Sequence, residues 1–347
     1  MLVYHIVLIK SILFYKNFVF FLFFLFLSLT NSFFYFIIIL YYYSEDFIMT
    51  KTSKALLAVF CGNSIFGFSF LASRIILSKT SVFVLLSSRF LLAFLIMNIL
   101  ALFGVFKLNF KGKPLIKVLL LGLCQPIAYF ICESYGIELT NSSFSGTLIA
   151  VVPLFAFIFA TVFIGEKLTI RQLLWGICTV AGVIIVSVGG GDNSPVTLPG
   201  VLLLIGAVIS GALFNVLSRA ASKEFSPFER TYVMFALAAV IFTACAFVES
   251  RGKLPIILAS LLPDIGFSLS LIFLSLFSSV VAFMLLNYAT TYIPVRKTSI
   301  FSCLTTVVSI IAGIVFLKEP FGGIRQVIGS ALILIGVYMI SIAEKNN

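Results

Sequence analysis

The sequence predicts an all-α integral membrane protein with ten transmembrane helices arranged as two inverted five-helix repeats, and three observations lead to this fold class. Hydrophobic residues make up 61% of the 347 residues and charged residues only 10%, and the mean hydropathy is +1.22. A soluble domain carries about 25% charged residues, so the surplus apolar surface requires lipid to cover it. The second observation is a set of apolar runs of membrane-spanning length, and the third is an internal repeat. The composition excludes a soluble enzyme, a disordered protein and a disulfide scaffold.

The apolar runs have the length of transmembrane helices. A helix needs about 20 apolar residues to cross the hydrocarbon core, whereas a barrel strand needs only about 9–11 and alternates in polarity. Long unbroken runs therefore predict helices, which satisfy their backbone hydrogen bonds internally. The predicted spans lie near 55–74, 82–104, 115–137, 144–164, 172–189, 198–218, 231–248, 265–288, 298–317 and 325–343.

Residues 1–48 differ from the rest of the chain. The stretch 18–43 is almost entirely Phe, Leu, Ile and Tyr, and no small-residue cleavage site follows it, so it does not resemble a signal peptide. One interpretation is one or two additional spans, and the other, which we favour, is that Met49 is the native start. We therefore expect an apolar N-terminal extension (1–48), a first repeat (49–191) and a second repeat (192–347).

The distribution of basic residues predicts the orientation in the membrane. Lys and Arg concentrate in the segments that share a side with the Met49 tail, and fewer lie in the alternate segments. Because basic loops stay in the cytoplasm, both ends of 49–347 are expected there. The net charge of +11 is explained by this topology and does not indicate a nucleic-acid partner. We expect a multi-pass protein of the plasma (inner) membrane.

An ordered series of matches between two parts of the chain indicates a duplicated unit of five spans. Glu166 and Glu319 each end an apolar span, and each precedes the next span. Ser73-Arg74 near the start of the first unit matches Ser218-Arg219 in the second. Five is odd, so the second unit enters the membrane from the opposite side, and inverted repeats place a binding site near the midplane. Further matched pairs are Tyr135 with Tyr288, Gly182 with Gly336 and Ser187 with Ser341.

These residues resemble the drug/metabolite transporter superfamily, and specifically its EamA-type members. The resemblance is carried by the stretch Pro153–Glu166, by Glu319 and by Ser88-Arg89-Phe90, and it covers about 49–343. It implies ten helices and the movement of small metabolites, often driven by an ion gradient. The second repeat departs from the first, with Lys318 at the place of Gly165 and Thr306 at the place of Pro153.

Two ionisable residues within predicted spans are candidates for function, because charged groups at lipid depth are costly. Glu133 lies inside the span near 115–137, and we expect it to couple transport to protons. The alternatives are a carboxyl group paired with Arg89 or one that reaches water at the interface. Arg89 lies early in the second span and could bind an anionic substrate group through its planar guanidinium. The alternatives are an internal ion pair or a side chain that extends to the membrane interface.

Neutral polar residues from both repeats are the other substrate-binding candidates. Asn63 and Asn215 fall in the first spans of the two repeats, and Tyr135 and Tyr288 fall in corresponding later spans. Such groups also bridge helices, as Gln125 could do. Glu166 and Glu319 close their spans at the interface, so we expect them to be structural, through a backbone hydrogen bond or a pair with Arg171 or Arg325.

The remaining motifs favour a carrier over an enzyme. The six cysteines form no C-x-x-C pair, and the only histidine is His5, so no metal site and no cofactor are expected. The Gly189–Gly191 run lacks the Lys-Ser/Thr of a nucleotide-binding loop. We expect a secondary active transporter of an amino acid or similar polar solute that works by alternating access. A membrane enzyme acting on a lipid-like substrate and a passive helix-bundle partner are the alternatives, and a homodimer is left open.

Overall fold

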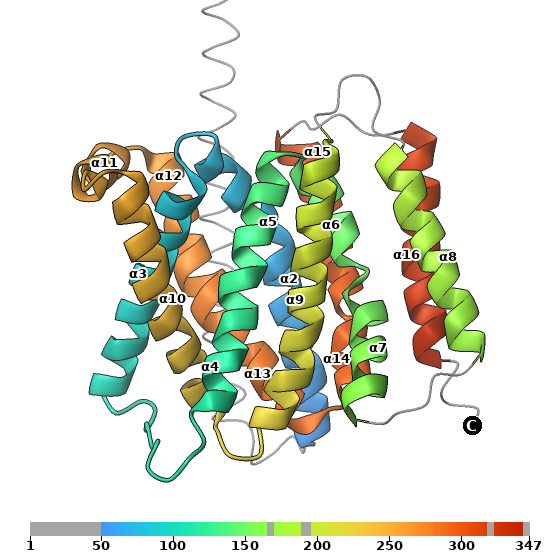
Figure 1. Cartoon of the computed structure of the whole chain (residues 1–347), viewed down its shortest axis with the longest axis horizontal. Helices are drawn as coiled ribbons and strands as arrows, with labels where there is room; N and C mark the ends of the chain where they lie inside the picture. The colour runs from blue at the N-terminus through green and yellow to red at the C-terminus, as the bar shows by residue number, and fades with distance from the viewer. Residues whose placement is uncertain (1–49, 165–169, 189–195, 318–322, 343–347) are drawn as a thin grey trace, which may run out of the picture.

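The structure is a computed structural model, and it describes residues 50–164, 170–188, 196–317 and 323–342. All regular secondary structure within these ranges is helical, and the helices form one bundle in which most elements run roughly alongside each other (Figure 1). The helices before residue 191 are α2 (Lys51–Leu77), α3 (Val82–Leu102), α4 (Ile116–Gly122), the π-helical η1 (Leu123–Ala128), α5 (Tyr129–Glu138), α6 (Ser142–Ile149), α7 (Val152–Ile164) and α8 (Ile170–Val188).

The helices after residue 191 follow a similar order. A second π-helical segment lies within a long helix, as η1 does in the first part of the chain, and a short helix, α11, was not predicted. The elements are α9 (Leu198–Ala221), α10 (Pro227–Glu249), α11 (Leu254–Leu261), α12 (Ile265–Ile272), η2 (Phe273–Val281), α13 (Ala282–Tyr292), α14 (Val295–Ile300), α15 (Ser302–Leu317) and α16 (Gly323–Ile342).

Seven helical stretches of the described chain are long and apolar enough to cross a membrane. The predicted runs near 172–189, 298–317 and 325–343 coincide with α8, α15 and α16. The protein is therefore an all-helical, multi-pass membrane protein. The seven stretches are Lys51–Leu77, Val82–Leu102, Ile116–Glu138, Phe144–Phe163, Leu198–Ala221, Pro227–Glu249 and Ile265–Tyr292.

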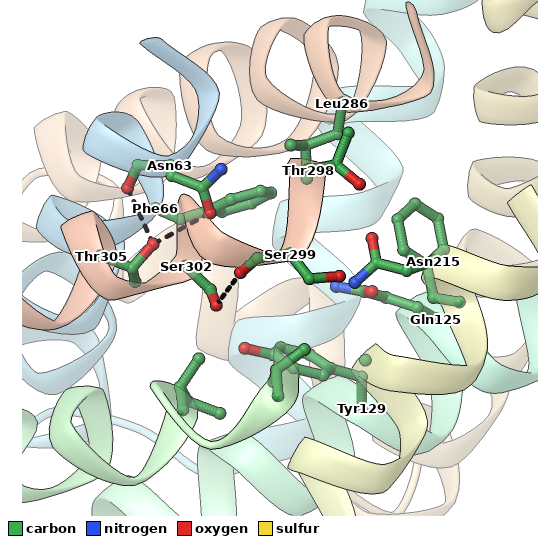
Figure 2. A pocket seen from close by; sticks show the side chains of 14 residues that line it. Asn63, Phe66, Gln125, Tyr129, Asn215, Leu286, Thr298, Ser299, Ser302 and Thr305 are labelled. Atoms are coloured by element: carbon green, nitrogen blue, oxygen red, sulfur yellow. Dashed lines mark hydrogen bonds between the residues drawn. The ribbon is translucent and has the colours of Figure 1, made fainter. Parts of the chain in front are cut away.

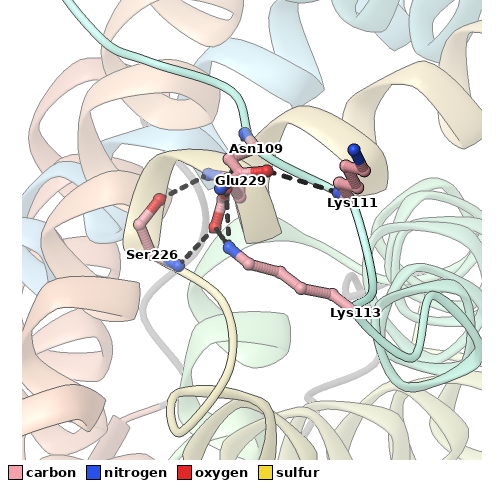
Figure 3. Close-up of polar contacts among 5 residues, drawn as sticks. All are labelled: Asn109, Lys111, Lys113, Ser226 and Glu229. Atoms are coloured by element: carbon pink, nitrogen blue, oxygen red, sulfur yellow. Dashed lines mark hydrogen bonds and ion pairs between the residues drawn. The ribbon is translucent and has the colours of Figure 1, made fainter.

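Polar residues set where these helices begin. The Asn141 side chain accepts a hydrogen bond from the Phe144 N–H (2.7 Å) and starts α6. At the start of α10 the Ser226 hydroxyl accepts from the Glu229 N–H (3.2 Å), and the Glu229 carboxylate accepts from the Ser226 N–H (2.8 Å). This reciprocal pair satisfies two N–H groups that the helix leaves free. Glu229 also accepts hydrogen bonds from Lys113, so the same carboxylate joins α10 to the loop before α4 (Figure 3).

The main packing pairs join one helix from before residue 191 to one from after it. The pairs are α3 with α10, α5 with α9, α2 with α13 and α15, α6 with α15, and α8 with α16. The last pair lies at one edge of the bundle, on the right in Figure 1, and the start of α2 and the end of α16 lie at the same end of the bundle. A buried aromatic cluster fills the centre. The centroid of the Phe90 ring lies 5.3–5.4 Å from the ring centroids of Phe130, Phe235 and Phe242.

Candidate functional site

A cavity lined by both polar and apolar side chains lies between the two sets of helices (Figure 2). Its volume is about 60 Å³, which is room for about two water molecules at roughly 30 Å³ each. A solute of amino-acid size therefore requires the cavity to widen. The lining residues come from α2, η1, α5, α6, α7, α9, α13, α14 and α15, and they are Asn63, Phe66, Gln125, Tyr129, Ile149, Val152, Gly211, Phe214, Asn215, Leu286, Thr298, Ser299, Ser302 and Thr305.

One wall of the cavity forms where a long helix is interrupted. Between α4 and α5 the backbone leaves helical geometry at Gln125 (φ −145°, ψ 119°), and Pro126, which follows it, has no N–H group to donate. Interruptions of this kind within a membrane are tolerated where the backbone is buried in protein or lines a cavity. The irregular segment places the Gln125 carboxamide on the cavity and carries Tyr129 one turn further along.

The opposite wall combines α2 with α15. The Thr305 hydroxyl donates to the Asn63 backbone carbonyl (3.0 Å) and to its side-chain oxygen (3.2 Å). The Asn63 amide donates in turn to the Val59 carbonyl (2.8 Å). On the neighbouring turn the Ser302 hydroxyl donates to the Ser299 carbonyl (2.6 Å). These bonds satisfy Asn63, Thr305 and Ser302 within the protein and hold this wall together.

The described side chains that line the cavity are neutral, and two charged side chains, Glu133 and Arg89, interact near Tyr129. The Tyr129 side chain hydrogen-bonds to Glu133, one turn further along α5, and Arg89 interacts electrostatically with Glu133. Glu133 is 2% exposed and Arg89 is fully buried. Arg89 donates to the hydroxyls of Ser279 (2.8 Å) and Ser278 (2.9 Å) on η2. The guanidinium of Arg89 is thus engaged with protein groups away from the cavity.

Two of the five predicted substrate-binding residues line the cavity. Asn63 and Asn215, from the first predicted span of each repeat, both reach it. Arg89, on α3, instead donates to Ser278 and Ser279 on η2. Tyr135 packs edge-on against Phe83 (6.1 Å between ring centroids), and Tyr288 packs against Tyr292 (4.8 Å). Neither tyrosine lines the cavity. Glu166 and Glu319, the predicted structural glutamates, lie outside the described residues.

Sequence reasoning did not single out several lining residues as substrate contacts. Gln125 was recognised as a polar group within a span, and the adjacent Pro126 was the available signal that the helix is interrupted there. Tyr129, Ser299 and Thr305 had no such signal, because each is a common residue in an apolar run. Their position on the cavity follows from helix rotation and tilt, which an apolar sequence does not specify.

Apolar helices of membrane-spanning length around an internal cavity define a polytopic membrane protein. The sequence model of the EamA-like transporter family matches residues 53–188 and again 198–342. The chain belongs to this family, and it is a membrane transporter. The resemblance to the EamA-type members of the drug/metabolite transporter superfamily is confirmed.

Individual proteins agree with this assignment. The uncharacterized transporter YcxC of Bacillus subtilis (strain 168) is 33% identical over 286 residues, covering 82% of this chain and 91% of YcxC. A "probable terminal-alkyne amino-acid exporter" of Streptantibioticus cattleyicolor is 24% identical over 233 residues, covering 67% of this chain and 74% of that protein. One solved crystal structure superposes with a TM-score of 0.61 at 17% identity, covering 85% of this chain and all of the solved one, and shows that the two share a fold.

Proposed function

We propose that the protein is a secondary active transporter that moves an amino acid or similar polar solute by alternating access. In this proposal two five-helix repeats are inverted relative to one another, and the cavity between them opens to each side in turn. The observation that carries the proposal is the cavity between helices from both parts of the chain, which is lined by carboxamide and hydroxyl groups together with apolar side chains. A passive structural bundle has no need of unfilled polar space at its centre.

Three features support the inverted repeat. The family model matches the chain twice in succession. The third long helix of each part contains a π-helical segment, η1 in the first and η2 in the second. The packing pairs also follow the pattern of a two-fold axis, because α2 packs on α13 as α9 packs on α5, and α3 with α10 and α8 with α16 are equivalent helices in contact.

The chemistry of the cavity supports a small polar solute. Carboxamides and hydroxyls supply both donors and acceptors, and Phe66 and Phe214 supply apolar surface beside them. An amino acid combines hydrogen-bonding groups at one end with a side chain at the other. The relative from Streptantibioticus cattleyicolor, whose name describes an amino-acid exporter, points to the same class of solute.

Proton coupling through Glu133 is part of the proposal. Glu133 is buried within a membrane-spanning helix, where ionisable groups commonly belong to proton pathways. Its hydrogen bond with Tyr129, which lines the cavity, connects the carboxyl group to the space where the solute would sit. Movement of a solute in the cavity can thereby affect whether Glu133 holds a proton.

Transport is tested with the purified protein in liposomes. A panel of radiolabelled L-amino acids is presented with and without a pH gradient, and the accumulated solute is recovered and analysed. We expect at least one amino acid to accumulate chemically unaltered and faster with the gradient. No flux of any member of the panel would contradict transport of amino acids, and a chemically altered product would favour a membrane enzyme.

The coupling role has its own variant and a matched control. Glu133→Gln removes the titratable group and keeps its size, whereas Glu138→Gln changes an exposed glutamate on the same helix. We expect the gradient dependence to disappear in the first variant and to persist in the second. Glu133→Gln protein with undiminished gradient dependence would show that another group carries the proton.

The proposed topology places both ends of 49–347 in the cytoplasm of a cell with this protein in its plasma membrane. Arg251 and Lys111 are exposed residues in loops at opposite ends of the bundle. A single cysteine at either position, in a cysteine-free background, is treated with a membrane-impermeant maleimide on intact cells. We expect labelling of Arg251→Cys only, and labelling of Lys111→Cys instead would invert the orientation.

A further inference from the structure

Three polar side chains on the cavity differ from the others because their hydrogen-bonding groups are uncommitted. Gln125 from η1, Asn215 from α9 and Ser299 from α14 all line it, and Figure 2 shows them grouped at one place. The Ser299 hydroxyl is buried and has no hydrogen-bond partner. Within the described part of the chain, no hydrogen bond joins the Gln125 or Asn215 carboxamide to another group.

Burial makes this lack of partners informative. Ser299 is 2% exposed and Gln125 is 6% exposed, so bulk water does not satisfy them freely. Buried polar groups in native proteins almost always find a partner, and exceptions call for a ligand, an ordered water or a functional reason. The other polar lining groups illustrate the rule, since Asn63, Thr305 and Ser302 are bonded within the protein.

The three groups also share a chemical character. A carboxamide offers two donor hydrogens and an acceptor oxygen, and a hydroxyl offers one donor and two acceptor positions. The set therefore recognises a group that has donors and acceptors side by side. It carries no charge, and the side chains around it are neutral as well.

A solute with net charge would lack a counter-ion among the described side chains that line this place. Burying an unpaired ion in a low-dielectric space is far more costly than burying a hydrogen-bonded neutral group. Among the described side chains, the charged residues Arg89 and Glu133 interact with one another and do not line the cavity. A molecule with balanced charges, such as the ammonium and carboxylate of an amino acid with a neutral side chain, avoids this cost.

We propose that Gln125, Asn215 and Ser299 form the solute-recognition site and that it selects solutes of zero net charge with adjacent donor and acceptor groups. This inference rests on the proposed transport through the cavity and adds the three residues and the charge rule. The site is assembled from both parts of the chain, with Gln125 from the first and Asn215 and Ser299 from the second. Movement of one repeat against the other would thus assemble or separate the site.

The test uses full-length protein in liposomes and five named solutes near neutral pH. L-Serine, L-glutamine and L-leucine carry no net charge, L-lysine carries a positive charge and L-glutamate a negative one. We expect the wild type to move at least one neutral amino acid about tenfold faster than either charged one, because the site has no counter-ion. Equal or faster flux of L-lysine or L-glutamate overturns the charge rule and leaves transport itself in place.

Replacing the Asn215 carboxamide with a carboxylate provides a sharper test. Asn215→Asp keeps the size of the side chain and introduces a negative charge, so we expect it to lose neutral flux about tenfold and to favour L-lysine over the neutral solutes. An unchanged order of preference would remove Asn215 from the recognition site. Because the expected result includes a gain for L-lysine, misfolding cannot imitate it.

The role of the Ser299 hydroxyl is tested with a matched control at another buried serine. Ser299→Ala removes the unpartnered hydroxyl, and we expect neutral flux to fall about tenfold. Ser87→Ala removes another fully buried serine, whose hydroxyl donates to the Val84 carbonyl on α3, and should leave flux within about twofold. Equal effects of the two changes would contradict a recognition role for Ser299. No wild-type flux of any of the five solutes would instead contradict the proposed transport, and the recognition site with it.

Discussion

Arg74 and Arg219 make the same contact in the two parts of the chain. Near the end of α2, Arg74 donates from Nη1 to the Ile137 carbonyl (2.9 Å) at the end of α5. Near the end of α9, Arg219 donates from Nη1 to the Thr290 carbonyl (2.8 Å) at the end of α13. In both cases a guanidinium satisfies carbonyl groups that a helix leaves free at its C-terminal end, where the helix dipole also attracts positive charge.

The two contacts lie at opposite ends of the bundle, because α2 and α9 run in opposite directions (Figure 1). Each arginine links the first long helix of its part of the chain to the third. The matched Ser-Arg pairs in the sequence therefore correspond to matched positions in space, and this equivalence supports the proposed inversion of the repeats.

Removing either arginine should destabilise the protein. Arg74→Gln and Arg219→Gln each leave carbonyls without a charged donor, and hydrogen bonds to charged groups contribute about 1.5–3 kcal/mol. We expect a lower midpoint of thermal unfolding in detergent for both variants. Lys111→Gln removes an exposed cation and serves as the control. An unfolding midpoint for either arginine variant equal to that of Lys111→Gln would refute the role.

Glu229 should matter more for stability than another paired glutamate nearby. Its side chain is 4% exposed and its carboxylate lies 2.7 Å from Lys113 Nζ, whereas Glu224 is 31% exposed and pairs with Lys117 at 2.6 Å. Glu229 also accepts from the Asn109 N–H (2.9 Å), so it joins the α3–α4 loop to the start of α10 (Figure 3).

We expect Glu229→Gln to lower the free energy of unfolding by about 2–4 kcal/mol, because the almost fully buried carboxylate loses the charge that pairs with Lys113. Glu224→Gln should cost about 1 kcal/mol or less, as exposed ion pairs usually do. Denaturant unfolding in detergent, followed by circular dichroism, measures both. The prediction fails if the order of the two variants is reversed.

Gly146 is required where α6 crosses α15. A Cβ atom there would overlap the Ser309 side chain, and the Thr306 hydroxyl donates to the Gly146 carbonyl (2.7 Å), which holds the helices together. We expect Gly146→Ala to destabilise the fold by about 1–3 kcal/mol through overpacking. A Cβ atom added at Gly62 would lie 3.4 Å from its nearest neighbour, which is an ordinary contact distance. Gly62→Ala should therefore leave the stability unchanged or raise it slightly. Equal midpoints of thermal unfolding for Gly146→Ala and Gly62→Ala would show that α6 and α15 can move apart to accommodate the added methyl group.

Asp264 should make the stability of the folded protein depend on pH. Partial burial would raise the pKa of Asp264, but the hydrogen bond and charge of Lys79 and the Phe267 N–H (2.7 Å) outweigh burial and hold the pKa below its usual value. The unfolded chain therefore binds a proton more readily than the folded one. The stabilisation is complete above the unfolded pKa of about 4 and is lost as pH falls through the lower folded value.

A pair of acid titrations checks this prediction. Thermal midpoints of the wild type should fall on acidification below about pH 4, and Asp264→Asn should show a smaller fall because it has no proton to gain. Identical acid profiles for the two proteins would show that Asp264 contributes nothing to the pH dependence.

The positions of the helices could be read from the sequence because of the solvent. In lipid, backbone groups must bond within their own segment, so each long apolar run has one available structure. The runs near 115–137 and 265–288 appear as Ile116–Glu138 and Ile265–Tyr292. The match between Ser73-Arg74 and Ser218-Arg219 indicated the repeat because polar residues are rare in an apolar chain, so a matched pair of them is easy to detect.

The sequence by itself thus determined a helical membrane protein and singled out Asn63 and Asn215, two residues that line the cavity. Only the tertiary structure separated Ser299, which faces the cavity unpartnered, from the other serines, and directed Arg89 to η2 instead of the cavity. The physical reason is that these helices are apolar on the lipid side and on the packed side alike. Their residue pattern therefore does not reveal which face turns inward, and packing against neighbouring helices decides it.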